Sequence, residues 1–267
     1  MSAYIYNGDA LEILKTFEDN SIHCAVTSPA YDKNRTYNQK SLVWDFEGIA
    51  KELYRTLCPG GVLCWNVNDM VVDGSETLTH ARQGIYFVDE VGFKLHDTMI
   101  YKKSNFSHPE KIRYHQVFEY ILILSKGTPR VFNPIKDRKN LTAGCIGNLG
   151  VNTYTEKDGS KSVRRKQVTA EYGMRHNVWE GNTRGQEEMC VELHHPAMMP
   201  KWLARDLIIS WSDVGDIVLD PFGGSGTTGL EAIKLGRQCI LIDIDSGYCK
   251  MAEEYCKLSE QRIEDGK

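Results

Sequence analysis

A glycine-rich loop between an apolar stretch and a helix-like stretch is the strongest chemical signal in the sequence. Residues 220–229 read Asp-Pro-Phe-Gly-Gly-Ser-Gly-Thr-Thr-Gly. Glycine permits a tight turn and lets the backbone approach a ligand that a Cβ would exclude. The free amides at the start of the following helix can bind a carboxylate or a phosphate. We therefore expect this loop to hold the charged part of a cofactor.

A carboxylate at the end of the next predicted strand fits the same interpretation. Asp243 lies 23 residues beyond Asp220, where nucleotide-binding α/β folds place an acid that holds ribose hydroxyls. Gly224, Gly226 and Gly229 also satisfy the GxGxxG pattern of dinucleotide sites. A nicotinamide-dependent oxidoreductase is therefore a competing interpretation of this loop.

A second segment, Thr27-Ser28-Pro29-Ala30-Tyr31, directly follows a short apolar stretch. Alone, it could be an ordinary proline-containing turn. Together with the glycine loop, it resembles motifs IV and I of the amino-group DNA methyltransferases, which use S-adenosylmethionine. The usual family forms of motif IV are DPPY, NPPY or SPPY. Ala30 replaces the second proline, which reduces the rigidity of the loop but keeps Tyr31 and the Pro29 carbonyl.

The resemblance covers nearly the whole chain. Residues 6–10, 52–55 and 59–61 resemble further family blocks, and His195-Pro196-Ala197 with Pro200 resembles the HPAxxP segment. Motif IV precedes the variable segment and motif I follows it, an order that is typical of the β group of this family. The resemblance implies an α/β, Rossmann-like methyltransferase fold with a mixed, mostly parallel sheet and an inserted, loop-rich target-recognition region.

The resemblance also implies roles for individual residues. Ser28 Oγ and the Pro29 carbonyl would accept hydrogen bonds from the exocyclic amine of a flipped base, and Tyr31 would stack on that base. Such acceptors free the lone pair of the amine for direct attack without a covalent intermediate, so that positioning and electrostatics carry the rate. The residues implied to bind S-adenosylmethionine are Asp9, Thr27, His195, Pro196, Asp220, Phe222, Gly223, Gly224, Ser225, Gly226, Thr227 and Asp243.

Several alternatives stay open on the sequence. The oxidoreductase interpretation leaves residues 28–31, the SPAY segment, unexplained. A catalytically weak DNA-binding protein would be consistent with the replacement of the second proline by Ala30. The permuted motif order argues against an amine methyltransferase of protein glutamine or RNA. Asp9 could cap the helix that follows it, and His195 could be a structural histidine. Serine at the first position of motif IV resembles the cytosine-N4 members slightly more than the adenine-N6 members, and the absence of a Pro-Cys pair argues against 5-methylcytosine chemistry.

The elements that must position these residues alternate between strands and helices, which is typical of a parallel sheet covered by helices. This alternation stops between 128 and 191, where glycine, asparagine, lysine and threonine dominate. We therefore predict one catalytic domain formed by 1–127 and 192–267, with 128–191 as the insert. The predicted strands cover 4–6, 22–26, 62–66, 94–103, 117–126, 217–219 and 238–244, and the predicted helices cover 10–17, 46–57, 77–92, 200–211, 226–235 and 248–262.

The charge distribution sets the inserted segment apart. The chain has a net charge of −4, yet residues 130–190 hold 11 Lys or Arg against 7 Asp or Glu. The remainder holds 21 basic and 29 acidic residues. A basic segment in an acidic chain can contact DNA phosphates, or it can be a solvated loop. The predicted DNA contacts are Lys157, Lys161, Arg164, Arg165 and Lys166.

Length and composition limit the class of protein. With 267 residues, 41% apolar and 25% charged, the chain is globular and needs neither disulfides nor a metal to fold. Its longest aliphatic run, 121–124, is too short to cross a membrane, and its N-terminus lacks a signal-peptide pattern. Eight cysteines without CxxC spacing predict a cytoplasmic protein with no metal site. Double-stranded DNA is the expected partner. The recognition sequence, a cognate restriction enzyme, and the choice between monomer and homodimer stay open.

Overall fold

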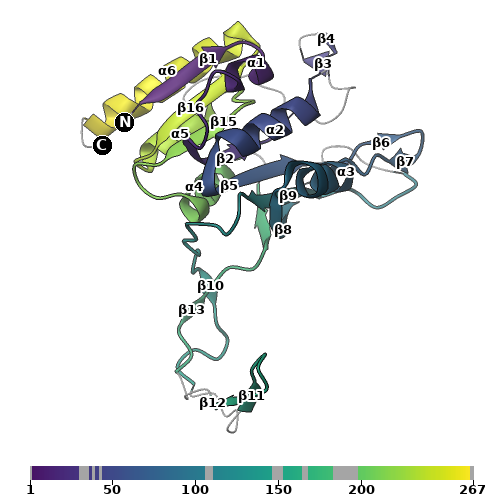
Figure 1. The fold of residues 1–267 in the computed structure, drawn as a ribbon, viewed down its shortest axis with the longest axis vertical. Helices are drawn as coiled ribbons and strands as arrows, with labels where there is room; N and C mark the ends of the chain where they lie inside the picture. Colours follow the sequence, from purple (N-terminus) through teal and green to yellow (C-terminus); the bar gives the residue numbers. More distant parts are fainter. Residues whose placement is uncertain are drawn as a thin grey trace. The chain divides into compact units, whose positions relative to one another are not determined.

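The computed structural model describes residues 2–29, 36–37, 40–41, 44–105, 111–145, 153–163, 168–182 and 198–264. The chain forms two compact units. The larger consists of Met1–Asn133 with Asn177–Lys267, and the smaller of Pro134–His176. The larger unit is an α/β structure built on one central sheet (Figure 1). No helix among these described residues is long and apolar enough to cross a membrane.

The central sheet has eight strands in the order β1-β16-β15-β2-β5-β9-β8-β14. Five neighbouring strands are parallel, whereas β9 runs antiparallel to both β5 and β8. The sheet is therefore mixed and mostly parallel, which confirms the predicted fold class. The strand bounds are β1 Ala3–Asn7, β2 Ile22–Thr27, β5 Leu57–Val67, β8 Lys94–Lys103, β9 Phe118–Ser125, β14 Val178–Gly181, β15 Ile217–Asp220 and β16 Gln238–Asp243.

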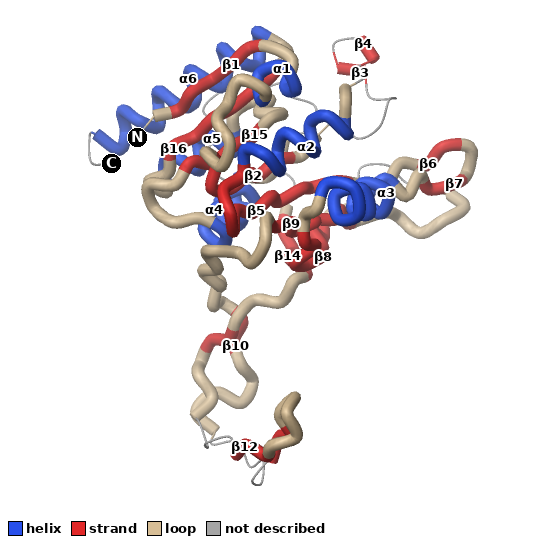
Figure 2. The backbone as a smooth tube through the Cα atoms, in the orientation of Figure 1, coloured by secondary structure: helices blue, strands red, loops and turns tan. Residues whose placement is uncertain are grey.

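Helices flank this sheet in two groups (Figure 2). Helix α1 packs against α2, and α5 packs against both α4 and α6. The right-handed connections from β1 through α1 to β2 and from β15 through α5 to β16 cross the sheet in opposite directions, which places their helices on opposite faces. The helix bounds are α1 Ala10–Leu14, α2 Phe46–Thr56, α3 Thr79–Tyr86, α4 Lys201–Trp211, α5 Thr227–Lys234 and α6 Ser246–Glu264.

Two elements differ from their predicted form. The helix predicted at 77–92 is divided into α3 and a π-helical turn, Phe87–Val91, which ends at Gly92 with a φ of +96°. Strand β5 begins at Leu57, directly after α2, so Pro59-Gly60-Gly61 lie within the strand. Proline and glycine weaken a strand locally, but the buried run that follows them keeps the segment in the sheet.

The smaller unit is shorter than the 128–191 insert expected from the sequence. Strand β14 is one part of the difference, because it pairs in parallel with β8 and buries Trp179 in the larger unit. The described residues of the smaller unit form two short antiparallel pairs and contain no helix. These pairs are β10 (Arg138–Lys139) with β13 (Tyr172–Gly173), and β11 (Thr153–Thr155) with β12 (Lys161–Val163).

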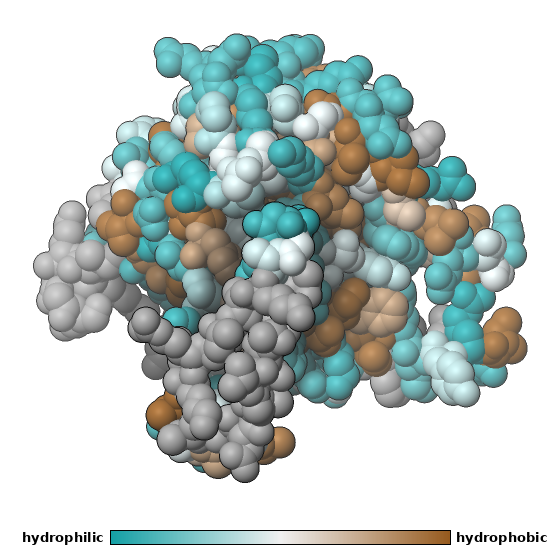
Figure 3. Space-filling view, turned by 60° about the horizontal axis from the view of Figure 1, so that its bottom comes forward, coloured by the Kyte–Doolittle hydropathy of each residue, from teal (hydrophilic) through white to brown (hydrophobic). Residues whose placement is uncertain are grey.

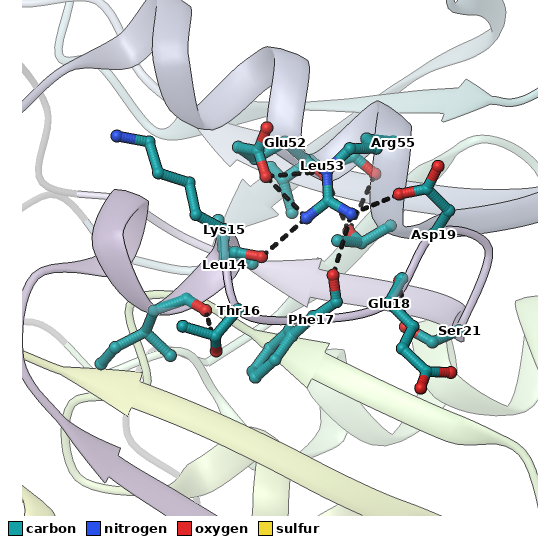
Figure 4. Close-up of polar contacts among 12 residues, drawn as sticks. Leu14, Lys15, Thr16, Phe17, Glu18, Asp19, Ser21, Glu52, Leu53 and Arg55 are labelled. Carbon is teal, nitrogen blue, oxygen red and sulfur yellow. Dashed lines mark hydrogen bonds and ion pairs between the residues drawn. The ribbon is translucent and has the colours of Figure 1, made fainter.

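Arg55 on α2 fixes the loop that leads into β2. Its guanidinium donates to the carbonyls of Leu14 and Phe17 and pairs with Glu52 and Asp19 (Figure 4). The hydrogen bond to Glu52, followed by that to Asp19, raises the pKa of Arg55. These contacts hold the entry of β2, and thereby the register of the strand that ends just before Ser28.

Two further hairpins lie outside the central sheet, namely β3 (Thr36–Tyr37) with β4 (Lys40–Ser41), and β6 (Val71–Val72) with β7 (Ser75–Glu76). Val71 and Val72 are exposed, as are Ile85 and Val88 near α3. On the face shown in Figure 3, apolar side chains form separate patches between hydrophilic ones. Scattered apolar exposure of this kind is normal for a folded protein.

Candidate active site

The carboxyl ends of the parallel strands bring the candidate residues to one edge of the sheet. Strand β1 ends at Asn7, β16 at Asp243, β15 at Asp220 and β2 at Thr27. The connections leave β15 and β2 in opposite directions, so the strand order reverses between these two strands. Open α/β sheets bind ligands at this kind of switch point.

Asp220 is the buried link between the glycine loop and the Ser28-Pro29 segment. Its Oδ1 accepts hydrogen bonds from Thr27 Oγ1 at 2.6 Å and from Phe222 N at 3.0 Å. Its Oδ2 accepts from Thr228 Oγ1 at 2.7 Å. Burial raises the pKa of Asp220 to about 6, although these hydrogen bonds oppose the shift. Asp220 and Thr27 therefore fix the Ser28-Pro29 segment relative to the glycine loop. Their contact with a cofactor stays a prediction.

The glycine loop turns where the sequence predicts a close approach. Gly224 has a φ of +50° and Gly226 a φ of +85°, a region that residues with a Cβ rarely adopt. A Cβ on Gly226 would lie 2.8 Å from Ala252 Cβ, and one on Gly223 would lie 3.0 Å from Leu241 Cβ. The loop consequently lies in close backbone contact with β16 and α6 at the start of α5.

The other residues of this loop are held from the surrounding elements. Phe222 packs edge-on against Trp44, with ring centroids 5.0 Å apart. Ser225 and Thr227 are buried, and their hydroxyl oxygens lie 3.5 Å apart. The loop is thus packed on one side through Phe222 and bonded within itself on the other.

Asp243 lies beside this loop, and each of its carboxylate oxygens accepts one hydrogen bond. Its Oδ2 accepts from Gly224 N at 2.9 Å, and its Oδ1 accepts from Asp245 N at 2.8 Å. Burial raises its pKa, and the two amide hydrogen bonds oppose that shift. Each carboxylate oxygen has about two acceptor positions, so one on each oxygen is left for a ligand.

Asp9 caps α1, which is the alternative that the sequence left open. Its Oδ1 accepts from Glu12 N at 3.1 Å. The backbone just before it contacts the end of β16, because Gly8 N donates to Asp243 O at 2.9 Å. The cap therefore lies next to the predicted ribose-binding carboxylate.

Ser28 and Pro29 follow β2 and face a polar group on the neighbouring strand. Pro29 is buried and Ser28 is half-buried. Asn66 Nδ2, on β5, lies 3.4 Å from Ser28 Oγ. Asn66 also donates to Glu119 on β9, and Glu119 pairs with Lys103 at the end of β8. The sequence analysis missed these three residues, although an asparagine and a glutamate inside apolar strands were a usable signal.

Several predicted residues lie outside the described part of the chain, so their roles stand on the sequence alone. They are Tyr31, Arg164, Arg165, Lys166, His195 and Pro196. Two predicted DNA contacts are described in the smaller unit. Lys157 is exposed in the turn between β11 and β12, and Lys161 begins β12.

The comparison with known families decides between the alternatives. A family described as DNA methylase matches residues 22–254. The chain belongs to this family. Its match spans both SPAY and the glycine loop, and the nicotinamide-dependent oxidoreductase is accordingly not favoured.

A relative agrees with this assignment, and solved structures have a similar fold. The orphan methyltransferase M.BamHII of Bacillus amyloliquefaciens is 44% identical over 242 residues, which are 90% of each chain. PvuII DNA methyltransferase, described as cytosine-N4-specific, has a TM-score of 0.67 at 20% identity and covers 100% of this chain and 94% of its own. TTHA0409 of Thermus thermophilus, solved with S-adenosyl-L-methionine, has a TM-score of 0.63 at 24% identity, with 97% and 96% covered. The methylase therefore shares its fold with these two solved structures.

Proposed function

We propose that this methylase, acting in the cytoplasm, uses S-adenosylmethionine to methylate the exocyclic amine of a flipped base in double-stranded DNA, with cytosine N4 preferred to adenine N6. One observation carries the proposal. Asp220 joins the strand end before Ser28 to the glycine loop through short buried hydrogen bonds. An acceptor loop and a cofactor loop are thus supported by a single carboxylate at adjacent strand ends.

The described residues fit S-adenosylmethionine. The amides at the start of α5, directly after the glycine loop, suit a carboxylate. The acceptor positions left on Asp243 suit ribose hydroxyls. When bound, the cofactor supplies an electrophilic methyl group on a sulfonium centre.

Ser28 and Pro29 would prepare the amine for reaction. The lone pair of an exocyclic amine is delocalised into the base, which makes the nitrogen a poor nucleophile. Hydrogen bonds from its N–H groups to Ser28 Oγ and the Pro29 carbonyl would favour tetrahedral geometry and release the lone pair. Proline stiffens the loop that holds this carbonyl. The released lone pair would form the N–C bond as the bond between sulfur and the methyl group breaks, and the nitrogen would lose one proton, so no covalent intermediate is required.

The preference for cytosine N4 is supported by Ser28 at the first position of motif IV. The test digests duplex DNA, treated with the protein and S-adenosylmethionine, to nucleosides that are identified by mass. We expect N4-methyldeoxycytidine. N6-methyldeoxyadenosine would overturn the base preference alone, and 5-methyldeoxycytidine or no methylated nucleoside would overturn the proposal.

Asp243→Ala is expected to weaken the binding of S-adenosylmethionine at least about tenfold. A carboxylate that accepts from ribose hydroxyls makes charge-assisted bonds, each worth roughly 1.5–3 kcal/mol, and 1.4 kcal/mol is a factor of ten. Isothermal calorimetry measures the Kd, with Asp213→Ala as a control because Asp213 lies before β15 at the opposite edge. An unchanged Kd would move the ribose contact to another acid, with Asp245 as the first candidate.

The basic segment is expected to bind DNA phosphates without reading sequence. Arg164→Ala combined with Arg165→Ala should weaken binding to all duplexes alike and make the log–log salt slope shallower by up to about two units. Salt titrations on two unrelated duplexes measure this change. Lys250→Ala with Lys257→Ala, on exposed positions of α6, removes the same charge as a control. A loss confined to one duplex would mean that the arginines read bases, and unchanged curves would mean that the segment is only solvated.

A further inference from the structure

Behind Ser28, three polar residues on neighbouring strands form a chain of contacts. We propose that Glu119 is a positioning residue for Ser28, which it orients through the side-chain amide of Asn66. The inference rests on the proposed function, because it takes Ser28 Oγ as an acceptor for the target amine. Neither Glu119 nor Asn66 belongs to the motifs that the sequence analysis singled out.

The geometry is that of one amide shared between two acceptors. Asn66 Nδ2 lies 2.8 Å from Glu119 Oε2 and 3.4 Å from Ser28 Oγ. Asn66 is 2% exposed, so water competes little for these contacts. An amide nitrogen carries two hydrogens, and one can therefore point to each oxygen.

Glu119 decides which end of the Asn66 amide faces Ser28. An ionised carboxylate only accepts hydrogen bonds, so it attracts the NH2 group and repels the amide oxygen. Turning the amide over would place two oxygens together in a buried site. The charge on Glu119 thus keeps a donor directed at Ser28.

Lys103 holds the carboxylate of Glu119 in the orientation that its contact with Asn66 needs. Its Nζ lies 2.5 Å from Glu119 Oε1, the oxygen that does not face Asn66. Both side chains are largely buried, at 16% and 12% exposed. The ion pair fixes the direction of the carboxylate, so that Oε2 faces Asn66.

The consequence at Ser28 is a fixed hydroxyl direction. Because Asn66 presents a donor, Ser28 Oγ accepts from it, and the hydroxyl hydrogen must point away from Asn66. The direction of the hydroxyl is then set before a base arrives, and preorganised polar groups are effective because they need no rearrangement during the reaction.

Glu119→Gln reverses this orientation without changing the shape of the side chain. Lys103 can only donate, so it would bind the oxygen of the new amide, whose NH2 group would then face Asn66. Two NH2 groups cannot pair, and the Asn66 amide would turn over. We expect kcat to fall about tenfold, with KM for DNA and Kd for S-adenosylmethionine within about twofold of wild type.

A second substitution separates orientation from general damage. With Lys103→Met added to Glu119→Gln, the new amide is free to turn its oxygen toward Asn66, so kcat should recover most of the loss. A purely structural role predicts that the double variant is no better than the single one, and that result would overturn the inference. Glu180→Gln is the matched control. It breaks the exposed ion pair between Glu180 on β14 and Lys102 on β8 and should leave kcat unchanged.

The outcomes also distinguish this inference from the proposed function. A wild-type protein that methylates DNA amines, together with a Glu119→Gln variant of unchanged kcat, would overturn the role of Glu119 and leave the function standing. A wild-type protein that methylates no DNA amine would overturn both.

Discussion

Ser28→Ala is expected to lower kcat for DNA methylation by about 100-fold, the size of effect seen when one preorganised polar group is removed from a catalytic site. The substitution removes the hydroxyl oxygen that the proposed function assigns as an acceptor for the target amine. The cofactor contacts are assigned to the glycine loop and Asp243, so the Kd for S-adenosylmethionine should stay within about twofold of wild type.

Single-turnover methylation followed by mass spectrometry measures the first quantity, and calorimetry measures the second. Ser21→Ala is the matched control, because this half-buried serine precedes β2 at the opposite edge of the sheet and donates locally to Glu18 O. Loss of cofactor binding in a folded Ser28→Ala protein would show that the roles are assigned wrongly, and an unchanged kcat would remove Ser28 from the mechanism.

Features that depend on short stretches of sequence were predictable. The span of β8 was predicted as 94–103 and is observed as Lys94–Lys103, because alternating and apolar runs report burial directly. The glycine loop was predictable for another local reason, since the residues that need positive φ values or close backbone contact are themselves glycines. The position of the two motifs at one edge of the sheet was also predictable, because each motif directly follows a predicted strand.

Contacts between distant parts of the chain were not predictable. Thr27 and Asp220 are 193 residues apart, and Asn66 and Glu119 are 53 apart. No local pattern joins them, because each is placed by the strand order. Strand β14 is a similar case, since four residues after a loop-rich segment become a strand only by pairing with β8. Asp9 shows a different limit, because one aspartate beside a helix start fits both a cap and a ligand contact.

Gly226→Ala is expected to lower the free energy of unfolding by about 3 kcal/mol. A left-handed φ costs an alanine roughly 1–2 kcal/mol, and Gly226 has a φ of +85°. Its new Cβ would also lie 2.8 Å from Ala252 Cβ and 2.9 Å from Ala252 Cα on α6. Overpacking of this kind costs typically about 1–3 kcal/mol, and it cannot be relieved by rotating a side chain because Ala252 presents backbone.

Gly215→Ala isolates the backbone part of this effect. Gly215 has a φ of +89°, and its Cβ would meet nothing within 4 Å, so this variant should lose only about 1–2 kcal/mol. Thermal unfolding of both variants measures the difference, at roughly 2–4 °C per kcal/mol for a protein of this size. Equal losses would mean that α6 moves aside without cost. A larger loss for Gly226→Ala, together with weaker S-adenosylmethionine binding, would show that the close approach of the loop to α6 is what shapes the cofactor site.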